Sequence, residues 1–191
     1  VSEELLGRTE RYSFFDEICQ QHNIKLIATA HNKNDNAETI IMNLMRGATL
    51  QGLCGIPYKR GNIIRPLLDI SRADIEKYCC DNSLDYVTDS TNLHQDYTRN
   101  KVRLSLLPMI EEKFNPNFIS TLTDNARYFS EDNELIENIT NEEYNKIVKS
   151  NSASISKLNE LPLSISRRIV YKMLSSVFGG SIDISSKYVD A

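Results

Sequence analysis

A short apolar run followed directly by a helical repeat is the feature that most constrains how this chain folds. Residues 24–30 are mostly apolar, and the run is short enough to form a buried strand rather than a helix. From residue 31 onward the apolar positions recur at helical spacing and define one inward face: Ala37, Ile40, Ile41 and Leu44. Gly47 suits the end of that helix, because glycine adopts positive φ easily. The order strand then helix predicts an α/β fold.

A second stripe of the same predicted helix carries reactive side chains. It contains His31, Asp35 and Glu38, and it continues to Arg46. In an open parallel sheet, ligands bind where a strand ends and the next helix begins, and helix N-terminal N–H groups favour phosphate there. A His and an Asp four residues apart are also, and more often, a surface pair. Spacing alone therefore leaves both interpretations open.

Composition indicates a globular protein with a small net charge. The 191 residues carry a net charge of −4 and are 40% hydrophobic. Contacts with nucleic acid would therefore depend on local basic clusters. The four cysteines show no metal-binding spacing, which favours reduced thiols and predicts a cytoplasmic location. No segment is typical of a signal peptide or a membrane span, so we expect no membrane partner.

Asn115-Pro116-Asn117 marks the expected boundary between two domains, 1–115 and 116–191. The second domain is expected to be mostly helical. The other predicted elements are a helix over 5–22, a glycine-punctuated loop over 47–61, an extended segment over 63–68, a helix capped near Ser71, a weak strand over 84–87, a helix over 99–114 capped by Thr98, and a helix opened by Pro162.

Arginines supply the other candidate binding groups. Arg99 and Arg103 lie one turn apart near a predicted helix N-terminus, so both guanidinium groups are placed to face one phosphate. The simpler interpretation is a pair of solvent-exposed side chains. Arg65 is held in extended geometry by Pro66 between apolar neighbours, which is typical of a residue with a carboxylate or phosphate partner. Arg167 and Arg168 are expected on a solvated helix face.

Together these blocks resemble the tRNA(Ile)-lysidine synthetases, which are ATP-dependent enzymes of the PP-loop superfamily. The matching residues, in chain order, are Gly7-Arg8, Arg11-Tyr12, Ala30-His31, Asp35, Glu38-Thr39, Arg46-Gly47, Gly52-Leu53, Gly55-Ile56-Pro57, Arg65-Pro66-Leu67-Leu68, Ser71-Arg72, Asp89-Ser90, Asn92, Arg99-Asn100 and Arg103. The resemblance implies a remnant of a parallel-sheet domain of the adenine nucleotide alpha hydrolase type, which is Rossmann-like, followed by the start of a small helical domain that binds tRNA.

The resemblance also implies a reaction. In that family ATP activates the C2 oxygen of the wobble cytidine of an isoleucine tRNA with a CAU anticodon, and the amine of L-lysine then attacks C2 to give lysidine. By resemblance, His31 and Asp35 contact the nucleotide or its Mg²⁺, with Asp35 as the metal ligand, and Glu38 faces the lysine; these three are the candidate catalytic residues. Arg46 is assigned to the nucleotide. Phosphates of ATP or tRNA are assigned to Arg8, Arg65, Arg99 and Arg103.

Two departures from the family pattern qualify this assignment. Asn34 stands where the family often has Asp, which removes one potential metal ligand. The Ser-Gly-Gly-x-Asp-Ser loop that cradles pyrophosphate is absent from the sequence. The expectation is an interior fragment that lacks the first strands of its sheet, binds ATP negligibly and is inactive alone. Its unpaired strand edge predicts association, as a homo-oligomer or by exchange of elements.

Two rival functions remain to be tested. A tRNA 2-thiocytidine synthetase carries a similar His–Asp–Glu–Thr block, but it also uses CxxC pairs, which this chain lacks. A non-catalytic tRNA-binding module would use the arginines alone, and its binding would weaken steeply with salt and ignore ATP.

Overall fold

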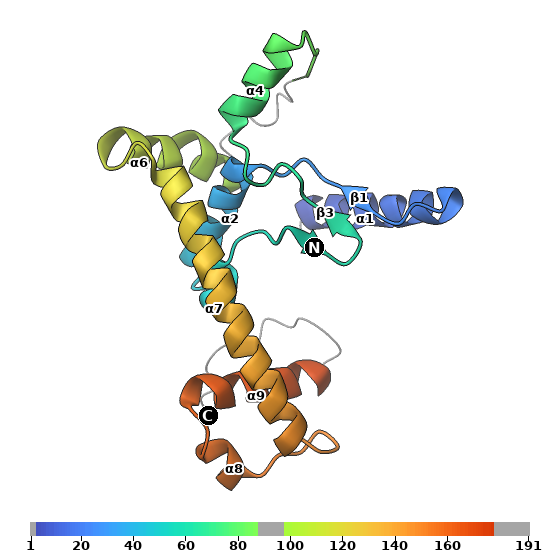
Figure 1. Ribbon diagram of the computed structural model, residues 1–191, viewed down its shortest axis with the longest axis vertical. Helices are drawn as coiled ribbons and strands as arrows, with labels where there is room; N and C mark the ends of the chain where they lie inside the picture. The colour runs from blue at the N-terminus through green and yellow to red at the C-terminus, as the bar shows by residue number, and fades with distance from the viewer. Residues whose placement is uncertain (1–2, 88–97, 178–191) are drawn as a thin grey trace. The chain divides into compact units, whose positions relative to one another are not determined.

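The computed structural model describes residues 3–87 and 98–177 (Figure 1). The chain divides into two compact units, Val1–Phe129 and Ser130–Ala191, and the division falls inside the long helix α7 (Phe118–Ile147). None of the helices in the described residues is both long and apolar enough to cross a membrane.

The first unit contains most of the secondary structure. Its helices are α1 (Glu3–His22), α2 (Lys33–Met45), α3 (Leu50–Leu53), α4 (Arg72–Asp81), α5 (Thr98–Lys101), the π-helical turn η2 (Val102–Leu106) and α6 (Leu107–Lys113). These positions confirm the helices predicted near 5–22, 33–46 and 99–114. Ser71 caps α4 as predicted, because its side chain accepts a hydrogen bond from the N–H of Asp74 at 3.1 Å.

The sheet is small and mixed. Strands β1 (Ile27–Ala28) and β3 (Ile63–Ile64) pair in parallel, and β2 (Lys59–Arg60) pairs antiparallel with β3. The strand order β1-β3-β2 leaves β1 at an edge. The predicted strand over 84–87 is wrong: those residues form no strand, and Val87 is 95% exposed, so burial does not stabilise an extended conformation there.

A capping box determines where α2 begins. The side chain of Asn32 accepts the N–H of Asp35 at 3.0 Å, and the carboxylate of Asp35 accepts the N–H of Asn32 at 3.1 Å. Residues before Asn32 are therefore outside the helix. His31 does not lie on the helical stripe with Asp35 and Glu38, contrary to the sequence prediction; it follows β1, with its Nδ1 2.9 Å from Oγ1 of Thr29.

The core of the first unit forms where α2 meets η2 and α6. Ala37, Ile41, Val102 and Leu107 are buried together. Three apolar side chains from the first turns of α7 pack against this group: Phe118, Ile119 and Leu122. This packing places the start of α7 in the first compact unit, although the expected domain boundary after residue 115 stays a prediction. Leu44 is 55% exposed, so the inward face of α2 is shorter than predicted.

A proline explains the π-helical turn that precedes α6. Pro108 has no N–H with which to bond the carbonyl of Leu104, and its ring crowds the preceding turn. The chain responds by widening, and the N–H of Leu107 bonds to the carbonyl of Val102, five residues back. Helical backbone therefore continues from Thr98 to Lys113 in spite of the proline.

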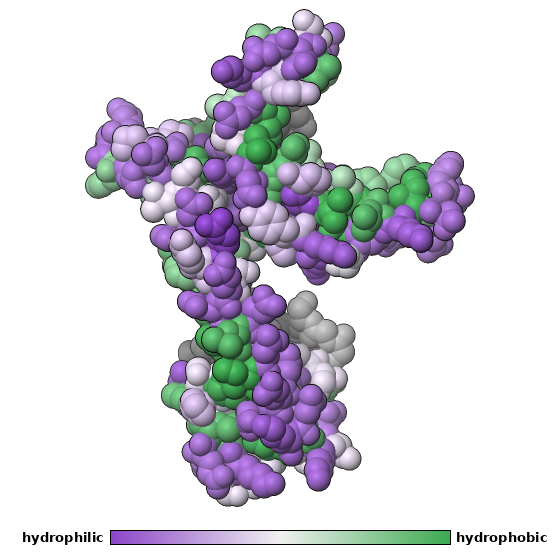
Figure 2. All heavy atoms as spheres, in the orientation of Figure 1, coloured by the Kyte–Doolittle hydropathy of each residue, from purple (hydrophilic) through white to green (hydrophobic). Residues whose placement is uncertain are grey.

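Apolar side chains are exposed around the edge strand and along α1, as Figure 2 shows for α1. Leu26 is 50% exposed and Phe14 is 57% exposed. These surfaces are consistent with the expectation that the chain associates, which stays a prediction.

The loop after α3 is held against α2 by a close contact. The side-chain oxygen of Asn36 accepts the N–H of Ile56 at 2.8 Å, and Gly55 has a φ of +71°. A Cβ atom at Gly55 would lie 2.2 Å from that same oxygen. Gly61, in the turn between β2 and β3, has a φ of +60° but open space around it.

We expect Gly55→Ala to destabilise the fold more than Gly61→Ala. Both changes incur the cost of a non-glycine residue at positive φ, about 1 kcal/mol. Gly55→Ala also displaces Asn36 from the N–H of Ile56, which adds about 1–3 kcal/mol. Urea unfolding followed by circular dichroism measures both, and equal losses would contradict the steric role of Gly55.

The second unit is a helical hairpin. It consists of the later turns of α7 with α8 (Ile155–Asn159) and α9 (Leu163–Val177), and Pro162 precedes α9 as predicted. Ile169 and Thr140 are fully buried. Arg168 is not on a solvated face, contrary to prediction: it pairs with Glu137 of α7, which also accepts from Nζ of Lys172 at 2.9 Å.

This cluster makes the hairpin sensitive to acid. Burial alone would raise the pKa of Glu137, but hydrogen bonds and charge from Lys172 and Arg168 outweigh it and lower the pKa below its usual value. The stabilisation is therefore present above the unfolded pKa and is lost as the pH falls through the lower folded pKa. We expect the stability advantage of wild type over Glu137→Gln to shrink from neutral pH to about pH 3.

Thermal unfolding across this pH range checks the expectation. Glu134→Gln is the matched control, because Glu134 is an exposed carboxylate on the same helix. A difference between wild type and Glu137→Gln that does not change with pH would exclude the ion cluster as its cause.

Candidate functional site

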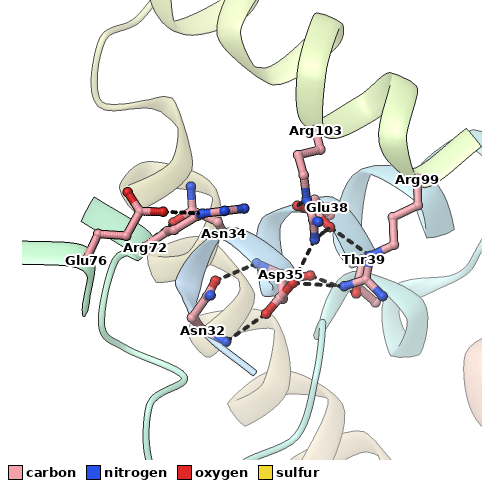
Figure 3. A network of polar contacts seen from close by, with 9 residues as sticks. All are labelled: Asn32, Asn34, Asp35, Glu38, Thr39, Arg72, Glu76, Arg99 and Arg103. Atoms are coloured by element: carbon pink, nitrogen blue, oxygen red, sulfur yellow. Dashed lines mark hydrogen bonds and ion pairs between the residues drawn. The ribbon is translucent and has the colours of Figure 1, made fainter. Parts of the chain in front are cut away.

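Two carboxylates of α2 meet two guanidinium groups from the α5–η2 segment (Figure 3). Asp35 and Glu38 are three residues apart and lie on one side of α2. Arg99 and Arg103 are four residues apart, so their side chains project from neighbouring positions on one helical face. We call these four residues the ion quartet. The structure therefore brings together four of the candidate residues that the sequence placed in two separate motifs.

Glu38 is the centre of the quartet. Its Oε1 accepts Nε–H of Arg103 at 2.6 Å, and its Oε2 accepts Nε–H of Arg99 at 2.7 Å and Nη2–H of Arg103 at 3.0 Å. The residue is only 1% exposed. A carboxylate buried to this degree is stable only when it is paired and hydrogen-bonded, and Arg99 and Arg103 supply both kinds of contact to Glu38.

Asp35 completes the network and is fully engaged. Its Oδ1 accepts Nη2–H groups of Arg99 and Arg103, each at 3.1 Å, while Oδ2 accepts the N–H of Asn32. Two negative and two positive groups make the quartet electrically neutral. Hydrogen bonds from Arg103 to Glu38, with the charges of both carboxylates, raise the pKa of Arg103 in spite of its burial, so it stays protonated.

A metal ion does not fit the quartet as it is arranged. Mg²⁺ needs oxygen ligands in near-octahedral geometry, and the carboxylate oxygens of Asp35 and Glu38 already accept hydrogen bonds from cationic or backbone donors. Within residues 3–87 and 98–177, no group of three or more His, Cys, Asp or Glu side chains is placed to hold a metal ion. The assignment of Asp35 as a metal ligand stays a prediction, and no step is derived through Mg²⁺.

A cavity of about 100 Å³ opens beside the quartet. Its lining residues come from the starts of α2 and α4, from η2 and α6, and from α7: Asn32, Asn34, Asp35, Glu38, Arg72, Arg103, Leu107, Pro108, Glu111 and Ile119. The starts of α2 and α4 are tied together there, because the side-chain oxygen of Asn34 accepts the N–H of Arg72 at 3.0 Å and the N–H of Lys33 bonds to the carbonyl of Ile70.

Two other candidate residues, Arg46 and His31, are not members of the ion quartet. Arg46 is the exposed residue that ends α2, about 16 Å along the helix from Asp35. His31 precedes α2 and contacts Thr29. The side chain of Arg8 lies outside the described residues, as do the motif residues Asp89, Ser90 and Asn92.

Arg65 is buried and bonds to the backbone of a neighbouring loop. It is 5% exposed, its Nη1–H donates to the carbonyl of Pro57 at 2.6 Å, and its backbone N–H donates to the carbonyl of Tyr58. Its Nε is buried with no hydrogen-bond partner in the described part of the chain. In this position Arg65 holds the loop that follows Gly55; its assignment to a phosphate stays a prediction.

Tyr58 anchors the same loop through a second contact. Its hydroxyl donates to Oδ1 of Asp69 at 2.6 Å, and this hydrogen bond, with burial and the charge of Asp69, raises the pKa of Tyr58 to about 12. Sequence reasoning did not identify this anchor, nor the lining residues Arg72 and Glu111 as site residues. Arg72 stood in a quoted motif, whereas Glu111 carried no local signal.

Comparison with known proteins assigns the class. The sequence matches the PP-loop domain family over residues 2–110. The chain belongs to this family, which confirms the α/β fold class expected from the sequence.

Three relatives of this chain carry the name tRNA(Ile)-lysidine synthase. Over 194 aligned residues the chain is 40% identical to the tRNA(Ile)-lysidine synthase of Clostridium perfringens, covering 99% of this chain and 41% of that protein. The corresponding enzyme of Caldanaerobacter subterraneus is 39% identical over 100% of this chain and 42% of its own length. That of Clostridioides difficile is 46% identical over 132 residues, 69% of this chain and 29% of its own length. The chain spans about two-fifths of the first two relatives.

We expect Glu38→Gln to destabilise the first unit by about 2–3 kcal/mol, because the two partly buried guanidinium groups then share one counter-charge, that of Asp35, instead of two. The matched control is Glu76→Gln. The Arg72–Glu76 pair is about half exposed, with side-chain exposures of 45% and 44%, and its loss is expected to cost no more than about 0.5 kcal/mol. Urea unfolding of both variants tests this, and similar losses would show that the quartet is not a major support of the fold.

Proposed function

We propose that this chain forms part of a tRNA(Ile)-lysidine synthase, an ATP-dependent carbon–nitrogen ligase. The C2 oxygen of the wobble cytidine attacks the α-phosphate of ATP and pyrophosphate leaves. The amine of L-lysine then attacks C2, and AMP leaves with the oxygen. The RNA substrate is an isoleucine tRNA with a CAU anticodon, and the reaction takes place in the cytoplasm.

The observation that carries this proposal is the meeting of two distant motifs in one network. Asp35 and Glu38 are separated from Arg99 and Arg103 by more than sixty residues in sequence, yet their side chains are in direct contact. The same motifs carry the resemblance to the lysidine synthetases. Relatives with that printed name match nearly the whole chain, which supports a shared function.

The charges of the quartet suit the two kinds of reactant. Guanidinium groups stabilise the negative charge of phosphates in nucleotidyl transfer, and Arg99 and Arg103 are proposed for that role. Carboxylates attract ammonium groups, and Glu38 is proposed to face the substrate lysine, as the family resemblance implies. His31 and Asp35 are proposed to contact the nucleotide, with Arg46 and Arg65 as further candidates for phosphates.

We expect tRNA-dependent incorporation of labelled lysine once the chain is extended upstream of Val1 to include a Ser-Gly-Gly-x-Asp-Ser loop. His31→Ala and Asp35→Ala should each reduce incorporation by about 100-fold or more, as loss of a group that stabilises transition-state charge does. Circular dichroism controls for folding, because Asp35 also caps α2.

The other outcomes separate the alternatives. Incorporation that is indifferent to both substitutions would keep the enzyme but remove the proposed site. A folded, extended protein that binds tRNA in a steeply salt-dependent manner but incorporates no lysine would indicate the non-catalytic binding module.

A further inference from the structure

The cavity beside the ion quartet is too small for a nucleotide. Sites that hold drug-sized ligands and cofactors occupy about 300–1,000 Å³, whereas this cavity measures about 100 Å³. Benzene fits an engineered cavity of about 150 Å³. The occupant is therefore a group of a few heavy atoms, or one end of a longer molecule whose remainder lies outside.

One carboxylate that lines the cavity, that of Glu111, has no ion-pair partner among the described residues. Asp35 and Glu38 are neutralised by Arg99 and Arg103, and Arg72 pairs with Glu76 at 2.8 Å. Glu111, on α6, lines the same cavity and is half-buried. Among the residues that the structure describes, it forms no hydrogen bond or ion pair. A half-buried carboxylate that forms no ion pair within the described part of the chain creates a local negative potential inside the cavity.

Part of the lining is apolar, and two of its residues, Leu107 and Pro108, lie one turn before Glu111 on α6. Leu107, Pro108 and Ile119 contribute hydrocarbon surface to the cavity, and Leu107 itself is only 3% exposed. A free carboxylate together with hydrocarbon walls favours a ligand that has a positive head and an aliphatic stem. A primary alkylammonium has this form, whereas a phosphate or a hydrated metal ion does not.

We propose that Glu111 is a specificity-determining residue that binds the primary ammonium of an aliphatic amine in this cavity. Resting on the function proposed above, the amine is that of the L-lysine substrate, with its methylene groups against Leu107, Pro108 and Ile119. Glu38 cannot take this role without losing an arginine, because both of its oxygens already accept guanidinium N–H groups. Glu111 accepts the ammonium and leaves the quartet intact.

Direct binding to the chain tests the site without ATP or tRNA. We expect L-lysine and n-butylamine to shift ¹H–¹⁵N resonances of α2 and α6, whereas norleucine, which has the stem without the ε-amine, does not. Glu111→Gln should weaken lysine binding at least tenfold, because it removes the charge that pairs with the ammonium. Glu112→Gln is the matched control: it changes the net charge equally on the same helix, but Glu112 is exposed and does not line the cavity.

Each remaining outcome has a definite meaning. Norleucine binding as well as lysine, Glu111→Gln binding as well as wild type, or no amine binding by the folded chain would overturn the proposal. Binding of n-butylamine or cadaverine through Glu111 without binding of lysine would overturn lysine as the ligand.

Kinetics of the extended enzyme distinguish this proposal from the proposed function. Glu111→Gln should raise KM for lysine while kcat changes little. Lysidine formation with an unchanged KM would refute the role of Glu111 alone, whereas Glu111-dependent amine binding without lysidine formation would refute the function alone.

Discussion

The burial of one carboxylate organises the first unit of this chain. Glu38 is 1% exposed on a helix that also supplies Ala37 and Ile41 to the core. Its charge is tolerable in that position only because cations reach it from another segment. The helical backbone from Thr98 to Lys113 must therefore lie against α2, and the apolar contacts of Val102 and Leu107 with α2 follow from the same placement. Electrostatics and hydrophobic packing thus select one arrangement.

The proline in that segment shows how the backbone adapts to this requirement. A regular α-helix cannot accommodate Pro108 without losing a hydrogen bond and meeting a steric clash. The π-helical turn immediately before it keeps the chain helical. Arg103 lies within this wider turn and reaches both Glu38 and Asp35, while Arg99 reaches them from the preceding turn. Such turns occur frequently at functional sites.

Local sequence rules predicted most of the helices but not how the side chains pair. The predicted cap at Ser71 and the role of Pro162 depend on neighbouring residues, and both predictions are confirmed. His31 was wrongly placed on α2, because the reciprocal cap between Asn32 and Asp35 excludes it. The contact of Arg103 with Glu38 joins residues 65 apart, so no periodicity reveals it. Glu111 stands out only once the other charged residues that line the cavity are seen to be paired.

Glu38 and Glu111 border the same cavity, but only Glu38 belongs to the ion quartet. Substitutions at the two positions therefore test different things. Glu38 belongs to the ion quartet and also borders the cavity, so a substitution there is expected to change stability and the lining of the cavity together. Glu111 borders the same cavity without belonging to the network, so its carboxylate can be neutralised while the quartet persists. The free energy of unfolding of a native protein is only about 5–15 kcal/mol. Loss of activity in a Glu38 variant is therefore ambiguous unless its folding is also measured. A change at Glu111 separates recognition of the amine from maintenance of the site that surrounds it.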